Sequence, residues 1–268
     1  MSVAVTAEPR GVPLEETLRA KRDAGRKLLV TYMTGGIAPN WVDYVEAMVA
    51  AGADAVEIGL PFSDPVMDGP TVQEASLRAL AAGATPASIL DAIGRSELTV
   101  PLVAMTYYNL VFRAGHERFA GMLAAAGVRG AIIPELPLEE SAGWEAASEA
   151  AGVAPVLLAA PVTPDARLAE ICRRARGFVY GVNLMGVTGE RATVAGSAAV
   201  LARRLKAETD LPVVMGFGIS TPEQAVSVAA EADGVVVASA LLRGLLAGAG
   251  PEQIGEQVAG LRAGLDAG

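Results

Sequence analysis

The sequence predicts a single (β/α)8 TIM barrel, an α/β fold, with an extra N-terminal helix before the first strand. Three observations favour this fold. Eight short apolar runs recur along the chain, Ala-rich segments with helical spacing lie between them, and the chain has 268 residues, of which 52% are hydrophobic. Barrels of this kind are built from about 250 residues as one domain. An open doubly wound sheet is the alternative that the same alternation allows.

The first predicted element is the extra helix at 11–25, and we expect about 1–12 to be disordered or loosely held. The predicted strands follow at 28–33, 54–59, 101–107, 130–135, 154–160, 177–183, 212–218 and 234–239. Each strand is continuously apolar, which is typical of parallel strands covered on both faces. No internal linker is long or polar enough to divide domains, so we expect one domain over 1–268.

The segments between the strands carry signals for helix starts and stops. The predicted N-cap residues followed by proline are Thr85, Thr163 and Thr221. Gln224 would complete a capping box with Thr221. The glycines expected to end helices just before the next strand are Gly52, Gly127 and Gly152.

Composition excludes several classes of function. The net charge is −9 and no long basic run is present, so nucleic-acid binding is not expected. Cys172 is the single cysteine, which suits a reducing cytoplasm, and with His116 as the single histidine a metal site is not expected. No apolar run reaches the roughly 18 residues of a membrane span, and no signal peptide is recognisable. We therefore expect a cytoplasmic protein that does not bind membranes.

Catalytic groups of a barrel lie at the C-terminal ends of its strands. Glu57 lies near the end of the second predicted strand, and Asp68 lies in the long loop that follows. A carboxyl within an apolar strand is costly unless it is paired or neutral, and burial raises its pKa towards the range that suits a general acid. From position alone, Glu57 is either a catalyst or a structural, hydrogen-bonded residue. Asp68 is either a catalyst or a turn former.

A phosphate cradle is predicted at the ends of the last two strands. Gly216 and Gly218 of GFGIS (216–220) allow close approach of backbone N–H groups, and ASALL (238–242) opens a helix whose N-terminus favours anions. Gly189 would add one more N–H group. Plain turn glycines are the alternative. No lysine ends a strand, so a Schiff-base mechanism lacks its amine. Carboxylate acid–base chemistry on a phosphorylated substrate remains.

Four motifs, in chain order, carry a resemblance to a known family. They are EIGLPFSDPVMDGP (57–70), MTYYNLVF (105–112), GVTGER (186–191) and GFGIS (216–220). The sequence resembles the tryptophan synthase alpha subunit family from about residue 14 to its C-terminus, and PFSDP followed by DGPT is the most specific part. The resemblance implies a lyase of L-tryptophan biosynthesis that cleaves indole-3-glycerol phosphate, by a retro-aldol reaction, to indole and D-glyceraldehyde 3-phosphate.

The resemblance also implies roles for individual residues. Glu57 would protonate C3 of the indole ring, Asp68 would stabilise the cation at the indole nitrogen, and Tyr180 matches a tyrosine near the acid. Tyr32 and Phe217 match positions that contact the ring. The phosphate site would comprise Gly189, Gly218 and the backbone at Ala238 and Ser239, beside Gly216 of the predicted cradle.

The family's partner is a beta subunit that uses pyridoxal phosphate to join indole to serine, in an alpha2beta2 heterotetramer. The resemblance therefore implies no cofactor in this chain, and it places Pro61, Asp64, Asn109 and Phe112 at the partner interface. One alternative is a free-standing lyase that releases indole, and another is a non-catalytic activator of the beta subunit. A third is a different phosphate-binding barrel, such as an isomerase of the same pathway, against which the PFSDP–DGP motif speaks.

Three positions depart from the family pattern. The eighth predicted strand ends in ASA, with Ala238 where glycine is usual, and the turn after the fourth is PELP, with Glu135 where aspartate is usual. The turn after the first strand is TGGIAPN (34–40) instead of TAGDP or TAGYP. These changes bear on the fit of the ligand and on the coupling to a beta subunit.

Overall fold

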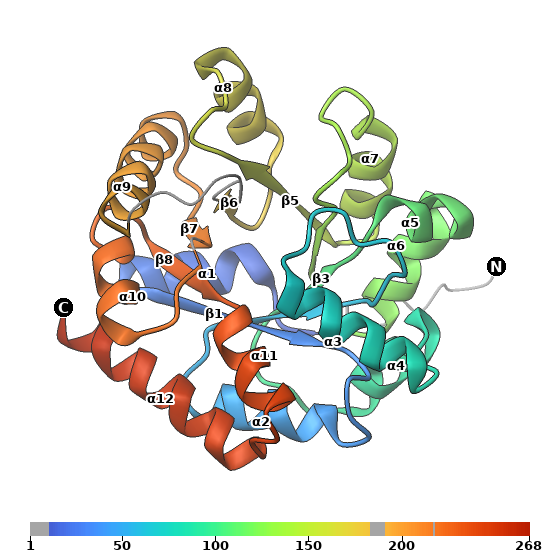
Figure 1. Cartoon of the computed structure of the whole chain (residues 1–268). Helices are drawn as coiled ribbons and strands as arrows, with labels where there is room; N and C mark the ends of the chain where they lie inside the picture. Colours follow the sequence, from blue (N-terminus) through green and yellow to red (C-terminus); the bar gives the residue numbers. More distant parts are fainter. Residues whose placement is uncertain (1–10, 183–190, 217) are drawn as a thin grey trace.

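Eight parallel strands close into a barrel in a computed structural model that describes residues 11–182, 191–216 and 218–268. The strands pair in chain order, and β8 pairs back with β1 in the register Leu28 to Gly234. The helices form a ring around them (Figure 1). The predicted barrel is confirmed, and the open-sheet alternative is wrong because the first and last strands are bonded to each other.

The strands are β1 Leu28–Thr34, β2 Ala55–Gly59, β3 Leu102–Met105, β4 Gly130–Ile132, β5 Ala154–Ala159, β6 Val179–Val182, β7 Val213–Gly216 and β8 Gly234–Val237. The helices are α1 Leu14–Asp23, α2 Trp41–Ala50, α3 Pro70–Ala81, α4 Pro86–Arg95, α5 Tyr108–Ala114, α6 His116–Ala125, α7 Ala142–Ala150, α8 Asp165–Arg174, α9 Arg191–Glu208, α10 Pro222–Ala229, α11 Ser239–Leu246 and α12 Pro251–Ala267. The stretch expected to be loose, 1–12, lies outside the described residues except for its last two. No described helix has both the length and the apolar character needed to cross a bilayer.

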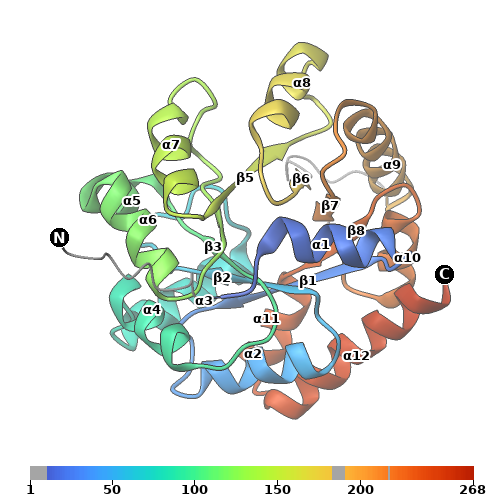
Figure 2. The same ribbon diagram turned by 180° about the vertical axis from the view of Figure 1, so that it is seen from behind.

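The barrel interior and its outer shell form two apolar clusters. The inner cluster is Leu14, Leu18, Leu28, Val30, Ala55, Val103, Ile132, Val156, Phe178, Val214 and Val236. Leu14 and Leu18 come from α1, which lies across the end of the barrel seen in Figure 2. The outer cluster fills the space between strands and helices. Because α1 closes one end with apolar side chains, a polar site is left to the opposite, C-terminal mouth.

The helix boundaries confirm most of the predicted signals. Thr85 and Thr221 are N-caps whose side chains accept the N–H groups of Ser88 and Gln224. The three predicted helix-ending glycines have φ values of 101°, 87° and 71°, a left-handed backbone that glycine adopts without strain.

Two predicted signals are wrong. The Gln224 side chain accepts the N–H of Ser220 at 2.8 Å, so it does not complete a capping box with Thr221. Helix α8 begins at Asp165, because Pro164 has an extended backbone with a ψ of 149°. The Thr163 hydroxyl instead accepts the N–H of Ala160 at 3.0 Å and closes the turn after β5.

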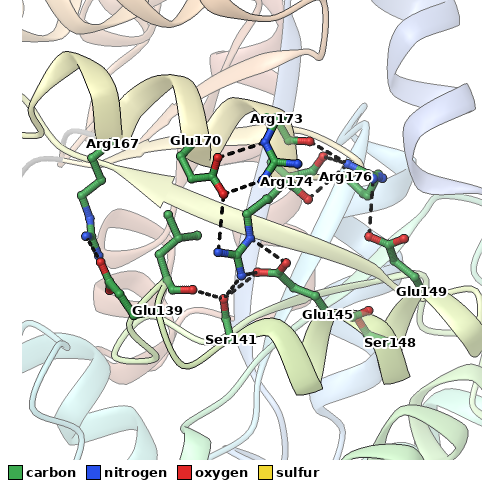
Figure 3. Close-up of polar contacts among 12 residues, drawn as sticks. Glu139, Ser141, Glu145, Ser148, Glu149, Arg167, Glu170, Arg173, Arg174 and Arg176 are labelled. Atoms are coloured by element: carbon green, nitrogen blue, oxygen red, sulfur yellow. Dashed lines mark hydrogen bonds and ion pairs between the residues drawn. The ribbon is translucent and has the colours of Figure 1, made fainter.

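Helices α7 and α8 are joined by ion pairs (Figure 3). Arg174 of α8 contacts Glu145 of α7 with oxygen–nitrogen distances of 2.7 and 2.9 Å, and Arg176 lies 3.6 Å from Glu149. A cavity of about 220 Å³ is lined by residues of both helices and of β5, including Trp144, Leu157 and Ile171. Charged contacts therefore join α7 to α8 and to the residues that follow it.

Candidate active site

Glu57 is buried inside the barrel near its C-terminal mouth. It occupies the middle of β2, pairs in register with Tyr32 of β1, and shares its strand parity with Ala55 of the inner cluster. Its side chain is 4% exposed, and its Oε2 atom has no hydrogen-bond partner in the described part of the chain. Burial, together with the charge of Asp68, raises the pKa of Glu57 to about 8. The carboxyl therefore holds its proton at neutral pH, as a general acid requires.

Asp68 lies at the same mouth, on the loop between β2 and α3. Its backbone closes a turn by donating from its N–H to the carbonyl of Pro65 at 3.1 Å, and its carbonyl accepts from the Gln73 side chain at 2.9 Å. Burial raises the pKa of the half-buried carboxyl to about 6, which the Tyr107 hydroxyl opposes and the charge of Glu135 reinforces. Asp68 is thus a turn former through its backbone and an ionised group through its side chain.

Two tyrosines fit the mouth only because glycines face them. A Cβ atom on Gly216 of β7 would lie 2.5 Å from Cε2 of Tyr180, and one on Gly59 of β2 would lie 1.9 Å from the hydroxyl of Tyr32. Burial raises the pKa of both phenols, and the charge of Glu57 adds to this for each. The two tyrosines therefore stay neutral beside the carboxyls.

The predicted phosphate cradle is described only in part. Gly218 has a φ of 70° and is exposed, and an added Cβ would meet no heavy atom within 4 Å. Ser239 is the first residue of α11, and Ala238 is its N-cap with a φ of −118°, so alanine is not strained there. Gly189 and Phe217 lie outside the described residues. The structure thus places two glycines, Gly216 and Gly218, at the end of β7 and one helix N-terminus at the end of β8.

Arg243 was not among the predicted site residues, because the predicted phosphate cradle consists of backbone N–H groups and a helix N-terminus. Its guanidinium donates to the hydroxyl of Ser220, on the loop after β7, at 3.0 Å. Within the described ranges no carboxylate comes within ion-pair distance of it. Ser239 and Arg243 are four residues apart on α11 and so share a helix face, a spacing that the sequence already contained.

The predicted interface residues lie on or next to the loops after β2 and β3. Asp64, Asn109 and Phe112 are exposed, Phe112 to 70%, whereas Pro61 is buried in the isolated chain. The Asp64 carboxylate accepts from the Ser63 hydroxyl at 2.5 Å. Two further apolar side chains on the β2 loop, Val66 and Met67, are 77% and 46% exposed.

Glu135, the departure after β4, contacts the next helix. Its carboxylate accepts the N–H of Tyr108, the first residue of α5, and its second oxygen finds no partner among the residues that the structure describes. Burial raises its pKa. The longer side chain thus reaches the start of the helix that carries Asn109 and Phe112. In the same described part, no three His, Cys, Asp or Glu side chains are grouped so as to hold a metal ion.

Comparison with known proteins agrees with this geometry. The sequence model of the family described as "Tryptophan synthase alpha chain" matches residues 18–264. The chain belongs to the tryptophan synthase alpha chain family. It is accordingly a lyase of tryptophan biosynthesis that acts on indole-3-glycerol phosphate. The alternative of a different phosphate-binding barrel is wrong.

Relatives in sequence and in structure are similar over nearly the whole chain. The tryptophan synthase alpha chain of Streptomyces avermitilis is 44% identical over 250 residues, 92% of this chain and 90% of the relative. That of Gloeobacter violaceus is 45% identical over 242 residues, 88% of this chain and 86% of the relative. A Mycobacterium tuberculosis tryptophan synthase structure superposes with a TM-score of 0.87 at 38% identity, covering 96% of this chain and 99% of the other.

Proposed function

We propose that Glu57 and Asp68 are the acid and the electrostatic partner of the retro-aldol cleavage. One observation carries this proposal. Two carboxyls of the same barrel mouth have pKa values on opposite sides of neutrality, about 8 for the buried Glu57 and about 6 for the half-buried Asp68. One is then protonated and the other ionised at pH 7, which is the division of labour that two-carboxylate chemistry uses.

The reaction balances with these two groups alone. Glu57 gives its proton to C3 of the indole ring, and the resulting cation at the indole nitrogen lies against the Asp68 carboxylate. The bond between C3 and the glycerol chain then breaks, and its electrons neutralise the ring. The Glu57 carboxylate takes the proton of the adjacent hydroxyl, which becomes the aldehyde of D-glyceraldehyde 3-phosphate. Indole leaves, the acid is restored, and no cofactor is required in this chain.

The other predicted residues bind the substrate in this proposal. Tyr32 and Phe217 contact the indole ring, and Tyr180 is the neutral phenol beside Glu57. The phosphate is held by the backbone of the loops after β6, β7 and β8, through Gly189, Gly216, Gly218, Ala238 and Ser239. The left-handed backbone of Gly218 and the N-terminus of α11 support this assignment.

The partner in this proposal is a tryptophan synthase beta subunit, in an alpha2beta2 assembly, with pyridoxal phosphate bound to the beta subunit. Pro61, Asp64, Asn109 and Phe112 form the interface. The exposed apolar side chains of Val66 and Phe112 support it, because such groups are suited to the centre of a covered patch. Direct transfer keeps small, apolar indole from escaping. The buried single cysteine, Cys172, suits the cytoplasm.

Turnover of indole-3-glycerol phosphate by the purified chain tests the proposal. Indole and D-glyceraldehyde 3-phosphate should form in equal amounts, and addition of a beta subunit should raise the rate. A fast rate that the beta subunit leaves unchanged would identify a free-standing lyase. Stimulation of the beta subunit without any cleavage would identify a non-catalytic activator and would refute the proposed chemistry.

A further inference from the structure

Tyr107, which follows β3, contacts the loop after β2 at two points. Its side chain is 2% exposed. The hydroxyl accepts the N–H of Met67 at 3.1 Å, and the ring stacks on Phe62 with 5.1 Å between centroids and 23° between planes. One buried side chain therefore fixes the loop on both sides of Asp64.

Asp68 directly follows Met67 and interacts with the same hydroxyl. Burial raises the pKa of Asp68 to about 6, whereas the Tyr107 hydroxyl favours the ionised carboxyl and lowers it. Four other titratable groups of the described chain interact with the carboxyl. The charge of Glu135 raises the pKa of Asp68. The charge of Asp68 in turn raises the pKa values of Glu57, Tyr32 and Tyr180. Among the groups of the described part of the chain that act on the Asp68 pKa, the Tyr107 hydroxyl is the one that favours ionisation.

The backbone around Tyr107 is held independently of that loop. The N–H of Thr106 donates to the carbonyl of Ile132 in β4 at 3.0 Å. On the other side, the Glu135 carboxylate accepts the N–H of Tyr108. The tyrosine thus stands on a support fixed to the neighbouring strand, which is what accurate placement of a reacting group requires.

We infer that Tyr107 is a positioning residue, which holds Asp68 where its carboxylate faces the indole nitrogen of the substrate. The inference rests on the role proposed above for Asp68. Tyr107 acts through the backbone of Met67 and through the Asp68 carboxyl. Its loss should therefore misplace and partly protonate Asp68 without removing a reacting group.

The substitution Tyr107→Phe keeps the stacked ring and removes the hydroxyl. We expect kcat for cleavage to fall about tenfold, the loss of roughly one hydrogen bond, with KM changed less than about threefold. The acid limb of the pH–rate profile should move to higher pH, because the ionised carboxyl loses a donor. Tyr108→Phe is the matched control, since its hydroxyl contacts His116 at 3.0 Å. Its kcat and acid limb should match the wild type.

The substitution Asp68→Asn distinguishes a failure of the positioning role of Tyr107 from a failure of the proposed role of Asp68. If it abolishes cleavage while Tyr107→Phe leaves kcat and the acid limb unchanged, the positioning role is overturned and the proposed function stands. If Asp68→Asn cleaves normally, the proposed role of Asp68 fails as well. Should Tyr107→Phe not fold, Phe62→Leu tests the same contact from the loop, and an unchanged kcat in that variant would also overturn the positioning role.

Discussion

At the residue scale, two carboxyls with similar intrinsic acidity differ because one is on a strand and the other on a loop. Glu57 points into the barrel and is 4% exposed, so burial dominates its pKa. Asp68 is half-buried and faces the Tyr107 hydroxyl, which limits the rise. The greater exposure of Asp68 to water and the Tyr107 hydroxyl thus keep the pKa of Asp68 about two units below that of Glu57. Acid–base catalysis at pH 7 can use this separation.

The pH dependence of kcat/KM should be bell-shaped. Glu57 must be protonated, so activity is lost as pH rises through about 8, and Asp68 must be ionised, so activity is lost as pH falls through about 6. Rates with indole-3-glycerol phosphate between pH 5 and 9 measure both limbs. A profile that stays flat over this range would show that the two carboxyls are not the groups whose protonation matters.

Gly216→Ala should disturb the active site without changing its charges. The new Cβ would lie 2.5 Å from Cε2 of Tyr180, so the ring must move, and we expect kcat/KM to fall roughly 10- to 100-fold. Gly121→Ala on α6 is the control, because an added Cβ there meets nothing within 4 Å. Equal activity of the two variants would show that the close contact with Tyr180 has no functional weight.

A residue could be predicted from the sequence when a local pattern determines its position, and could not when a contact between distant segments does. The place of Glu57 near the end of the second strand could be predicted from the apolar run that contains it, whereas its role as the acid was implied by the family resemblance and remains a prediction. The contacts of Tyr107 with Met67 and of Arg243 with Ser220 join distant segments, and no local pattern specifies them. Burial and the resulting pKa values likewise depend on the packed mouth rather than on sequence spacing.

At the element scale, the sequence located all eight strands, but several end earlier than predicted. Strand β3 was predicted to reach residue 107 and ends at Met105, and β4 was predicted to reach 135 and ends at Ile132. The apolar runs continue beyond the last backbone hydrogen bonds between the strands. Pro134, which follows β4, has no N–H group to donate to a neighbouring strand. Tyr107 and Glu135 lie at such overrun positions, whereas Glu57 lies within β2 and Asp68 on the loop that follows it.

The ion pair between Arg174 of α8 and Glu145 of α7 should stabilise the fold more than an exposed ion pair would. Arg174 makes two contacts with Glu145 and a third with Ser141 at 2.7 Å, and both members of the pair are largely shielded from water. Arg174→Ala should lower the free energy of unfolding by about 2 kcal/mol, as measured by urea denaturation.

Arg173→Ala on the same helix is the matched control. Its side chain is 69% exposed and pairs with Glu170 one turn away, so its loss should leave the free energy of unfolding nearly unchanged. Similar losses of stability in the two variants would mean that the bridge between α7 and α8 is not a distinct source of stability.

At the scale of the whole molecule, the closed barrel places the loop after β2, with exposed Val66 and Met67, next to α5, with exposed Phe112, because β2 and β3 are paired. Phe112→Ser should weaken binding of a tryptophan synthase beta subunit by about tenfold in dissociation constant, because large apolar residues anchor interfaces. Val200→Ser, on α9, removes an exposed apolar side chain from an outer helix and should leave binding unchanged. Loss of affinity in both variants, or in neither, would place the interface elsewhere.

Cleavage of indole-3-glycerol phosphate by Glu57→Gln tests the central claim most directly. Glutamine keeps the size of the side chain but has no acidic proton to give to C3, so kcat should fall by about 10² to 10⁴. Unfolding and the binding of D-glyceraldehyde 3-phosphate should stay close to the wild type, which separates lost chemistry from lost structure. A folded Glu57→Gln protein that cleaves the substrate within about tenfold of the wild-type rate would contradict the assignment of Glu57 as the acid.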